Sequence, residues 1–184
     1  MRKKQLVNNI LTLSLFMLFM SSCTVKAPES QYMTPEIDYS KFTTTGKTIK
    51  IGEVKGGIKP TSMGRPSIGN EGFQEALITT LRKSGLFKEV FTDGNSDYEL
   101  LTEIVAQKWH PGFSITSTLF VKYRLIEAKS NREIWKENIY SQYEAESEEA
   151  WLGQDRATKA NEGAVRENLK LLLEKLSDKI KNQT

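Results

Sequence analysis

Cysteine and histidine are nearly absent from this sequence, which has one of each among its 184 residues. A single cysteine excludes an intrachain disulfide, and one cysteine with one histidine cannot build a Cys/His zinc cluster. A broad excess of positive charge is missing as well. The formal net charge of +3 comes from Arg2, Lys3 and Lys4, because residues 1–22 contain no acid and the rest of the chain is balanced. A balanced chain is unlike a phosphate-backbone binder, so we expect no nucleic-acid partner.

Long hydrophobic runs are missing too, apart from one near the start. The apolar run at residues 10–20 (ILTLSLFMLFM) follows the three basic residues and precedes Ser21 and Ser22. A transmembrane helix needs about 20 apolar residues to cross a bilayer, and this run is much shorter. A basic start, a short apolar run and small residues are typical of a secretory signal peptide, which we place at residues 1–22.

The small residues lead directly into the only cysteine. The segment Met20-Ser21-Ser22-Cys23, followed by a polar stretch, resembles the lipobox of bacterial lipoproteins. The resemblance implies cleavage before Cys23 and acyl chains such as palmitate on that residue, and Thr24 in the next position implies transfer to the outer membrane. Two or more chains anchor a protein stably where one does not. The alternative is an incidental cysteine behind an ordinary signal peptide or an amino-terminal anchor helix.

Residues 23–47 are predicted to comprise the lipidated cysteine and a tether. Residues 24–47 contain two Pro, many Thr and Ser, and no period of two or 3.6, which is typical of a linker. Fully extended, a stretch of this length reaches no further than about 80 Å, so the folded part can stand clear of the membrane. In the alternative, apolar side chains dock part of this segment on the domain: Tyr32, Ile37, Tyr39 and Phe42.

The rest of the chain, residues 48–184, is predicted to form a single α/β periplasmic domain. Ile49 and Ile51 alternate with Lys50 and Gly52 in a first strand at 48–54. After a loop rich in Gly and Pro, a helix is expected at 71–84. It has Asn70 as its N-cap, Gly85 as its C-terminal stop, and apolar residues at helical spacing: Phe73, Ala76, Leu77 and Leu81.

Four further strands and a second helix complete the expected domain. Strands are predicted at 86–91, 98–109, 116–128 and 134–143, the last two as a hairpin. The apolar residues of 98–109 would also make one helical face, and the turn-rich residues on either side favour the strand. A long amphipathic helix is expected at 155–181. This order predicts an α+β fold, a mostly antiparallel sheet of about four to five strands with two helices packed on one face.

Part of this pattern is similar to small α/β domains of bacterial envelope proteins. The spacing Phe73-x-x-Ala76-Leu77-x-x-x-Leu81-x-x-Ser84-Gly85-Leu86-Phe87, followed by the Tyr98 strand and the Ile134-Trp135 strand, resembles YajG-type lipoproteins and the amino-terminal domain of TolB. The resemblance implies the fold and the compartment, and it supplies no catalytic residues.

Four residues are candidates for contact with a partner. Lys59 and Arg65 lie in the loop between the first strand and the first helix, where binding loops occur. Trp109 and Trp151, with Phe113 and Trp135, could form an aromatic platform for a ligand, although such residues more often pack in a core or on a sheet.

Catalytic candidates are few. His110 precedes Pro111 in a turn, and nothing in the sequence positions a carboxylate and a nucleophile beside it, so we interpret it as an exposed turn histidine. Glu148 and Glu149 are interpreted as a solvated acidic loop rather than an acid/base pair.

The sequence therefore predicts a lipoprotein of the outer membrane that faces the periplasm. We expect a non-catalytic binding or envelope-assembly domain without a cofactor or metal. Its partners would be the membrane, through the acyl chains on Cys23, and an envelope protein. The alternative is an auxiliary lipoprotein of a transport system that binds a lipid or a small apolar ligand between helix and sheet. A hydrolase is the third and least favoured hypothesis.

Overall fold

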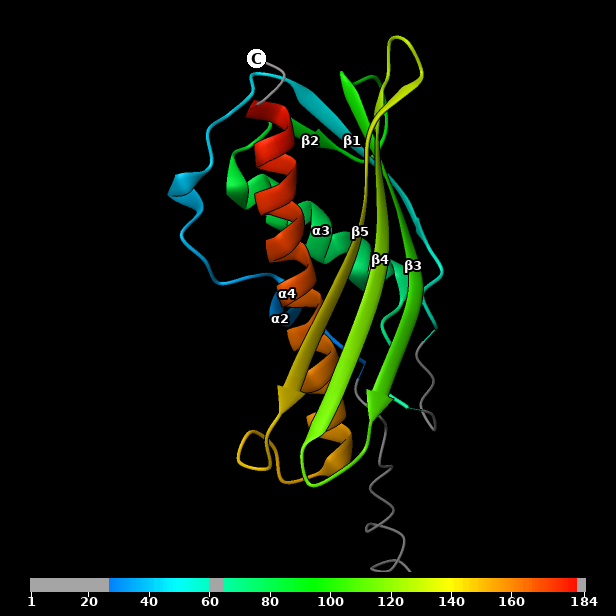
Figure 1. Ribbon diagram of the computed structural model, residues 1–184, viewed down its shortest axis with the longest axis vertical. Coiled ribbons are helices and arrows are strands. Elements are labelled where there is room, and N and C mark those ends of the chain that lie inside the picture. Colours follow the sequence, from blue (N-terminus) through cyan, green and yellow to red (C-terminus); the bar gives the residue numbers. More distant parts are fainter. Residues whose placement is uncertain (1–26, 60–64, 182–184) are drawn as a thin grey trace, which may run out of the picture.

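The computed structural model describes residues 27–59 and 65–181, which form one sheet with helices packed against it (Figure 1). Within these ranges no helix combines the length and the apolar character needed to cross a bilayer. The elements along the chain are α2 Ser30–Met33, the 3₁₀ turn η1 Tyr39–Lys41, β1 Thr48–Lys55, α3 Asn70–Ser84, β2 Glu89–Phe91, β3 Tyr98–His110, β4 Ile115–Glu127, β5 Arg132–Ala145 and α4 Gly153–Lys181.

The sheet has five strands in the order β2-β1-β3-β4-β5. Strand β1 pairs in parallel with β2, because α3 carries the chain back between these two strands, and β1 also pairs in parallel with β3 on its other side. Strands β3, β4 and β5 form two long antiparallel hairpins, in which Val121 pairs with Ile104 on one side and Ile139 on the other. The predicted α+β class, with helices packed on the sheet, is confirmed, and the sheet is mixed because of β1.

The core lies between the sheet and the two long helices. Leu169, Leu172, Leu173 and Leu176 of α4 are fully buried together with Leu119, Val121 and Leu125 of β4. The apolar face of the amphipathic helix expected at 155–181 is therefore buried in the core. Core residues of this kind each contribute about 1.5–3 kcal/mol by leaving water.

A small polar network crosses this apolar interface. The hydroxyl of Tyr123, a fully buried residue, donates to Asn168 Oδ1 at 2.7 Å, and burial raises the pKa of this tyrosine well above its usual value. Asn168 Nδ2 in turn donates to Ser141 Oγ at 3.1 Å and to the Ile139 carbonyl at 3.2 Å. A buried network with satisfied members specifies one alignment of helix and sheet.

Helix α4 approaches the sheet closely at Gly163. A Cβ atom built on this residue would lie 2.2 Å from Cγ of Tyr143 on β5, far inside van der Waals contact. The ring of Tyr143 thus lies directly on the helix backbone, and only glycine leaves room for it.

Two local predictions differ from the structure. The predicted N-cap is wrong: Gly69 caps α3, whereas Asn70 is its first residue and its Oδ1 accepts a hydrogen bond from the Gly57 amide at 2.7 Å. The strand predicted at 86–91 begins only at Glu89. Leu86 and Phe87 are buried in the main core, so these two apolar residues contribute to core packing and lie outside the strand.

The segment before β1 packs on the domain. Met33 is 1% exposed and its terminal methyl lies close to Gly72 of α3, and Ile37, Tyr39 and Phe42 pack against the main core. These three residues therefore pack on the domain, as the alternative to a free tether predicts. Tyr32, the fourth residue of that alternative, is half exposed. The maximum distance between Cys23 and the domain is therefore limited by the few residues before Glu29 rather than by the whole of residues 24–47.

Candidate functional site: a groove beside the first half of α4

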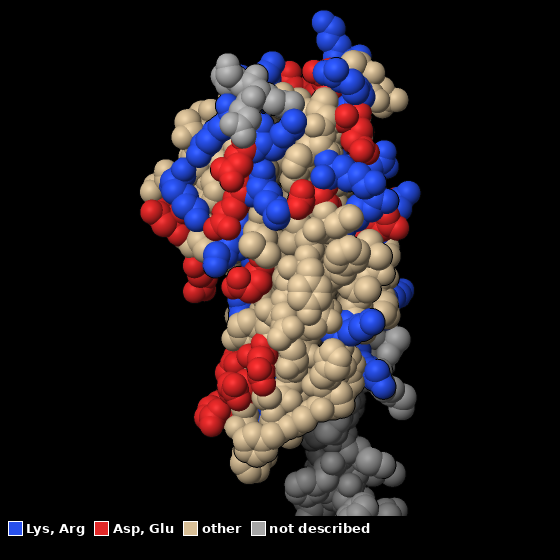
Figure 2. Space-filling view, in the orientation of Figure 1, with Lys and Arg blue, Asp and Glu red and all other residues tan. Residues whose placement is uncertain are grey.

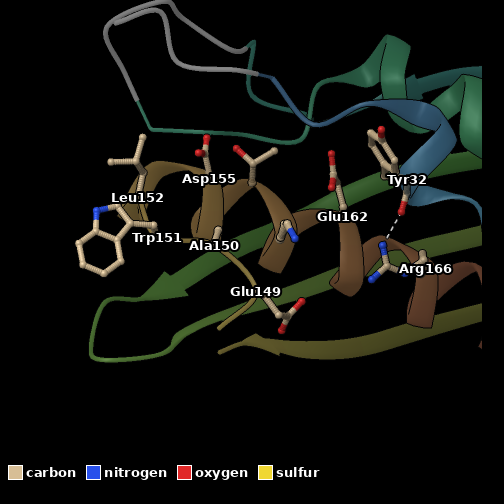
Figure 3. A pocket seen from close by; sticks show the side chains of 10 residues that line it. Tyr32, Glu149, Ala150, Trp151, Leu152, Asp155, Glu162 and Arg166 are labelled. Carbon is tan, nitrogen blue, oxygen red and sulfur yellow. Dashed lines mark hydrogen bonds between the residues drawn. The ribbon is translucent and has the colours of Figure 1, made fainter. Parts of the chain in front are cut away.

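A groove of about 850 Å³ runs beside the first half of α4 (Figure 3). Its walls are α2 and the loop between β5 and α4, and its floor is one face of α4. Trp151 and Leu152 lie at one end, and Tyr32 and Arg166 lie at the other. The lining residues are Tyr32, Glu149, Ala150, Trp151, Leu152, Asp155, Thr158, Lys159, Glu162 and Arg166.

The floor of the groove is the face of α4 that points away from the sheet. Asp155, Thr158, Lys159, Glu162 and Arg166 recur at spacings of three and four, so they share one side of the helix. The buried alanines in this half of the helix lie on the opposite side: Ala157, Ala160 and Ala164. The groove is therefore an outer surface of the domain and not a space between helix and sheet.

Both apolar and charged groups line the groove. Tyr32, Ala150, Trp151 and Leu152 supply apolar surface from the two walls. Three acids and two bases come from the floor and the loop: Glu149, Asp155, Glu162, Lys159 and Arg166. A mixed surface of this kind suits an elongated ligand or peptide with an apolar part and a polar end.

Arg166 and Glu162 hold the α2 wall in place. Arg166 Nη1 donates to the Tyr32 carbonyl at 2.5 Å, and its guanidinium carbon lies 5.4 Å from the centre of the Tyr143 ring (Figure 3). The Glu29 amide donates to Glu162 Oε1 at 3.0 Å. These charge-assisted hydrogen bonds hold residues 29–32 against α4 and thereby fix the position of this wall of the groove.

Glu149 closes the loop at the other wall. Its carboxylate accepts hydrogen bonds from the Tyr143 hydroxyl at 3.1 Å and from the Glu146 amide at 3.0 Å. Burial raises the pKa of Tyr143, and the negative charge of Glu149 raises it further. Glu149 thus has a structural role, while Glu148 is exposed.

The four predicted partner-binding residues fall into two groups. The Arg65 guanidinium carbon lies 4.9 Å from the centre of the Trp109 ring, a cation–π distance, so the structure brings these two together. Lys59 is exposed on the same loop as Arg65. Trp151 lines the groove instead and is 93% exposed. Trp109 is half-buried against a small apolar cluster: Ile115, Ala145, Ala157 and Ala160.

Cys23 and His110 are the two other residues of interest. Cys23 is outside the described residues. His110 is exposed at the end of β3, where it pairs with Thr116 across the hairpin.

Sequence reasoning did not place Tyr32, Glu162 or Arg166 in a binding site. The signal available for the last two was their recurrence on the polar side of the long helix, a pattern shared by ordinary solvated helix faces. Only the docking of α2 on that side makes it a groove.

No family model matches the sequence, and no curated protein matches it. Solved structures do match in fold. A protein of Xanthomonas campestris assigned to the family DUF330 has a TM-score of 0.63 and 12% identity, covering 82% of this chain and 93% of its own. A hypothetical protein of Chlamydia trachomatis has a TM-score of 0.55 and 10% identity, covering 74% and 98%. At such identities these likenesses establish the fold alone.

A minor lipoprotein of Acinetobacter baumannii is similar in structure to a lower degree. Its TM-score is 0.47 and its identity 9%, over 74% of this chain and 94% of its own. This likeness is too weak to carry an argument about the present chain.

Proposed function

We propose that this protein is a lipoprotein of the outer membrane, anchored through acyl chains on Cys23, with its domain in the periplasm as a non-catalytic binding or assembly module. The observation that carries the proposal is the segment Met20-Ser21-Ser22-Cys23 directly after a short apolar run. A lipid on the only cysteine replaces the transmembrane helix that the apolar run is too short to form.

The geometry of the groove supports a binding role rather than a catalytic one. Glu149, Glu162 and Arg166 hold the walls through the hydrogen bonds described above. A general base has to be within hydrogen-bond reach of the proton it takes, and His110 is not among the residues that line the groove. The groove therefore offers shape and contact surface, which a partner or ligand can recognise.

Mass spectrometry of the protein extracted from membranes tests the anchor directly. We expect the mature chain to begin at Cys23 and its amino-terminal peptide to carry the added mass of a glyceryl group and acyl chains. Alkaline hydrolysis should remove the ester-linked chains and leave the glyceryl thioether. An unmodified Cys23 thiol, or a mature chain that begins at another residue, contradicts the proposal.

The groove also favours a second candidate, an auxiliary lipoprotein of a transport system that carries a lipid or small apolar ligand. The core between α4 and the sheet is filled by fully buried side chains, so we place the ligand in the outer groove instead. Tyr32, Ala150, Trp151 and Leu152 would contact its apolar part, and Lys159 and Arg166 would face an acidic end.

Native mass spectrometry after gentle purification tests this candidate. Lys159 is exposed on the groove floor, so Lys159→Trp should fill the groove without disturbing the core and should abolish a co-purifying lipid. Lys136→Trp, an exposed position on β5 outside the groove lining, is the matched control and should retain the lipid. Wild-type protein without bound lipid, or lipid that survives Lys159→Trp, refutes ligand binding in the groove.

A further inference from the structure

Three large apolar side chains project from two loops at one end of the molecule. Phe113, in the loop between β3 and β4, is 83% exposed. Trp151 and Leu152, in the loop between β5 and α4, are 93% and 60% exposed. Both loops lie at the lower end of the view in Figure 1, where the surface shown in Figure 2 is largely uncharged beside one acidic patch. We call Phe113, Trp151 and Leu152 the apolar tip.

The two loops are joined to each other. Arg156, in the first turn of α4, donates from Nη1 to the Phe113 carbonyl at 2.9 Å and from its backbone amide to the Leu152 carbonyl at 3.1 Å. Behind the tip, Ile115 of β4 packs with Ala145 of β5 and with α4. These hydrogen bonds and this packing hold the two loops in place, so the exposure of the three side chains is a feature of the folded domain.

The tip lies within covalent reach of the lipid attachment site. Glu29, bonded to Glu162, marks where the chain leaves α4, and Glu162 is nine residues into that helix, or about 14 Å from its start at a rise of about 1.5 Å per residue. The six residues from Cys23 to Glu29 can span at most about 20 Å. The acyl chains and the apolar tip can therefore meet the same flat surface.

From this geometry we propose that the apolar tip enters the interface of the bilayer in which Cys23 is anchored, so that the domain stands on the membrane in one orientation. The inference rests on the proposed lipid anchor. Indole rings favour the level of the lipid headgroups, where an apolar body and a polar N–H are both satisfied. Exposed patches of large apolar side chains on a folded domain mark such contact sites.

The charge near the tip favours insertion over electrostatic adsorption. Glu146 and Glu148 are exposed in the same loop as Trp151. Acidic residues gain nothing from anionic headgroups, so contact of the tip should not require anionic lipid. The proposal therefore predicts the same insertion in zwitterionic phosphatidylcholine vesicles and in vesicles that contain phosphatidylglycerol.

A site-specific fluorescent label tests the orientation. Cys23 is the only cysteine, and lipid attachment consumes its thiol, so an introduced cysteine takes the label alone. The lipidated full chain with Trp151→Cys, labelled with the environment-sensitive dye NBD, is reconstituted into vesicles. We expect a blue shift of its emission and quenching by lipids with a spin label near the headgroup. Lys129→Cys, exposed in the turn between β4 and β5 at the opposite end, should show neither.

The outcomes separate this inference from the anchor itself. If the label at residue 151 behaves like the label at 129 while the protein stays on the vesicles, the tip does not enter the bilayer and the anchor stands. Protection of residue 151 only after crosslinking to an envelope protein in cells would also overturn the inference, in favour of a protein partner. If the chain without an introduced cysteine takes up the dye at Cys23, the anchor fails. Phe113→Cys repeats the test on the other loop and should match Trp151→Cys.

Discussion

Replacing Cys23 by Ser is expected to abolish acylation and to leave the chain either unprocessed or released from the membrane fraction. Each buried methylene of an acyl chain contributes about 0.8 kcal/mol, and stable anchoring takes two membrane-binding signals. The apolar tip is a weaker anchor than two acyl chains, since its three side chains contribute only about 1.5–3 kcal/mol each even when fully buried. Fractionation of cells grown with radiolabelled palmitate measures both effects.

The matched control keeps the cysteine and changes its small neighbour. Ser22→Ala exchanges one small residue for another, so processing, palmitate labelling and membrane association should all persist. The lipoprotein assignment is wrong if the Cys23→Ser chain is still cleaved at the same position and still sediments with the membranes.

A methyl group at Gly163 should destabilise the domain strongly. The new Cβ would lie 2.2 Å from Cγ of Tyr143, so α4 or the ring has to move, and so close an approach places the cost at the upper end of the usual range for overpacking, about 3 kcal/mol. Alanine regains about 1 kcal/mol of helix propensity. We expect a net loss of about 2 kcal/mol, which lowers Tm by about 4–8 °C in a domain of this size. Thermal unfolding followed by circular dichroism measures it.

Gly153 provides the control within the same helix. A Cβ there meets only Arg156 Nη2 at 3.9 Å, an ordinary contact, so Gly153→Ala should leave Tm unchanged or slightly higher. The double variant Gly163→Ala with Tyr143→Ala removes the clash, and its loss should be smaller than the sum of the single losses. Equal effects at Gly163 and Gly153 would show that α4 does not approach β5 this closely.

Local structure could be predicted where each residue's own neighbours decide it. The apolar spacing from Phe73 to Leu81 and the glycine at 85 define α3, and Gly85 indeed adopts a left-handed φ of 61° at the C-cap. The ambiguous segment at 98–109 became strand β3 because the flanking turns leave it facing β4. The prediction of Asn70 as the N-cap of α3 was wrong because a side-chain amide near the start of a helix can also bond a distant backbone group, here the amide of Gly57.

The parallel pairings of β1 could not be predicted in the same way. Which strands become neighbours depends on where α3 packs as it crosses the sheet, and the residues of β1 do not encode that. The same reason explains Leu86 and Phe87, whose apolar run is typical of a strand but which are buried in the main core before β2 begins.

The candidate site was less predictable than the fold. The sequence offers Trp151 as part of an aromatic platform for a ligand, but it does not give the exposure of this residue, because a sequence does not distinguish a core tryptophan from a projecting one. Arg65 and Trp109 were both named without any sign that they would stack. Tyr32 and Arg166 are far apart in the chain and form the groove only after α2 docks on α4.

By itself, the sequence determined the helices, most of the strands and the predicted point of lipid attachment, since periodicity, turn residues and a short targeting pattern act over a few neighbouring residues. The tertiary structure alone decided the order of the strands, the groove beside α4 and the apolar tip. Those features are made by residues that are distant in the chain, and they come together only when burial of the common core sets where each helix lies on the sheet.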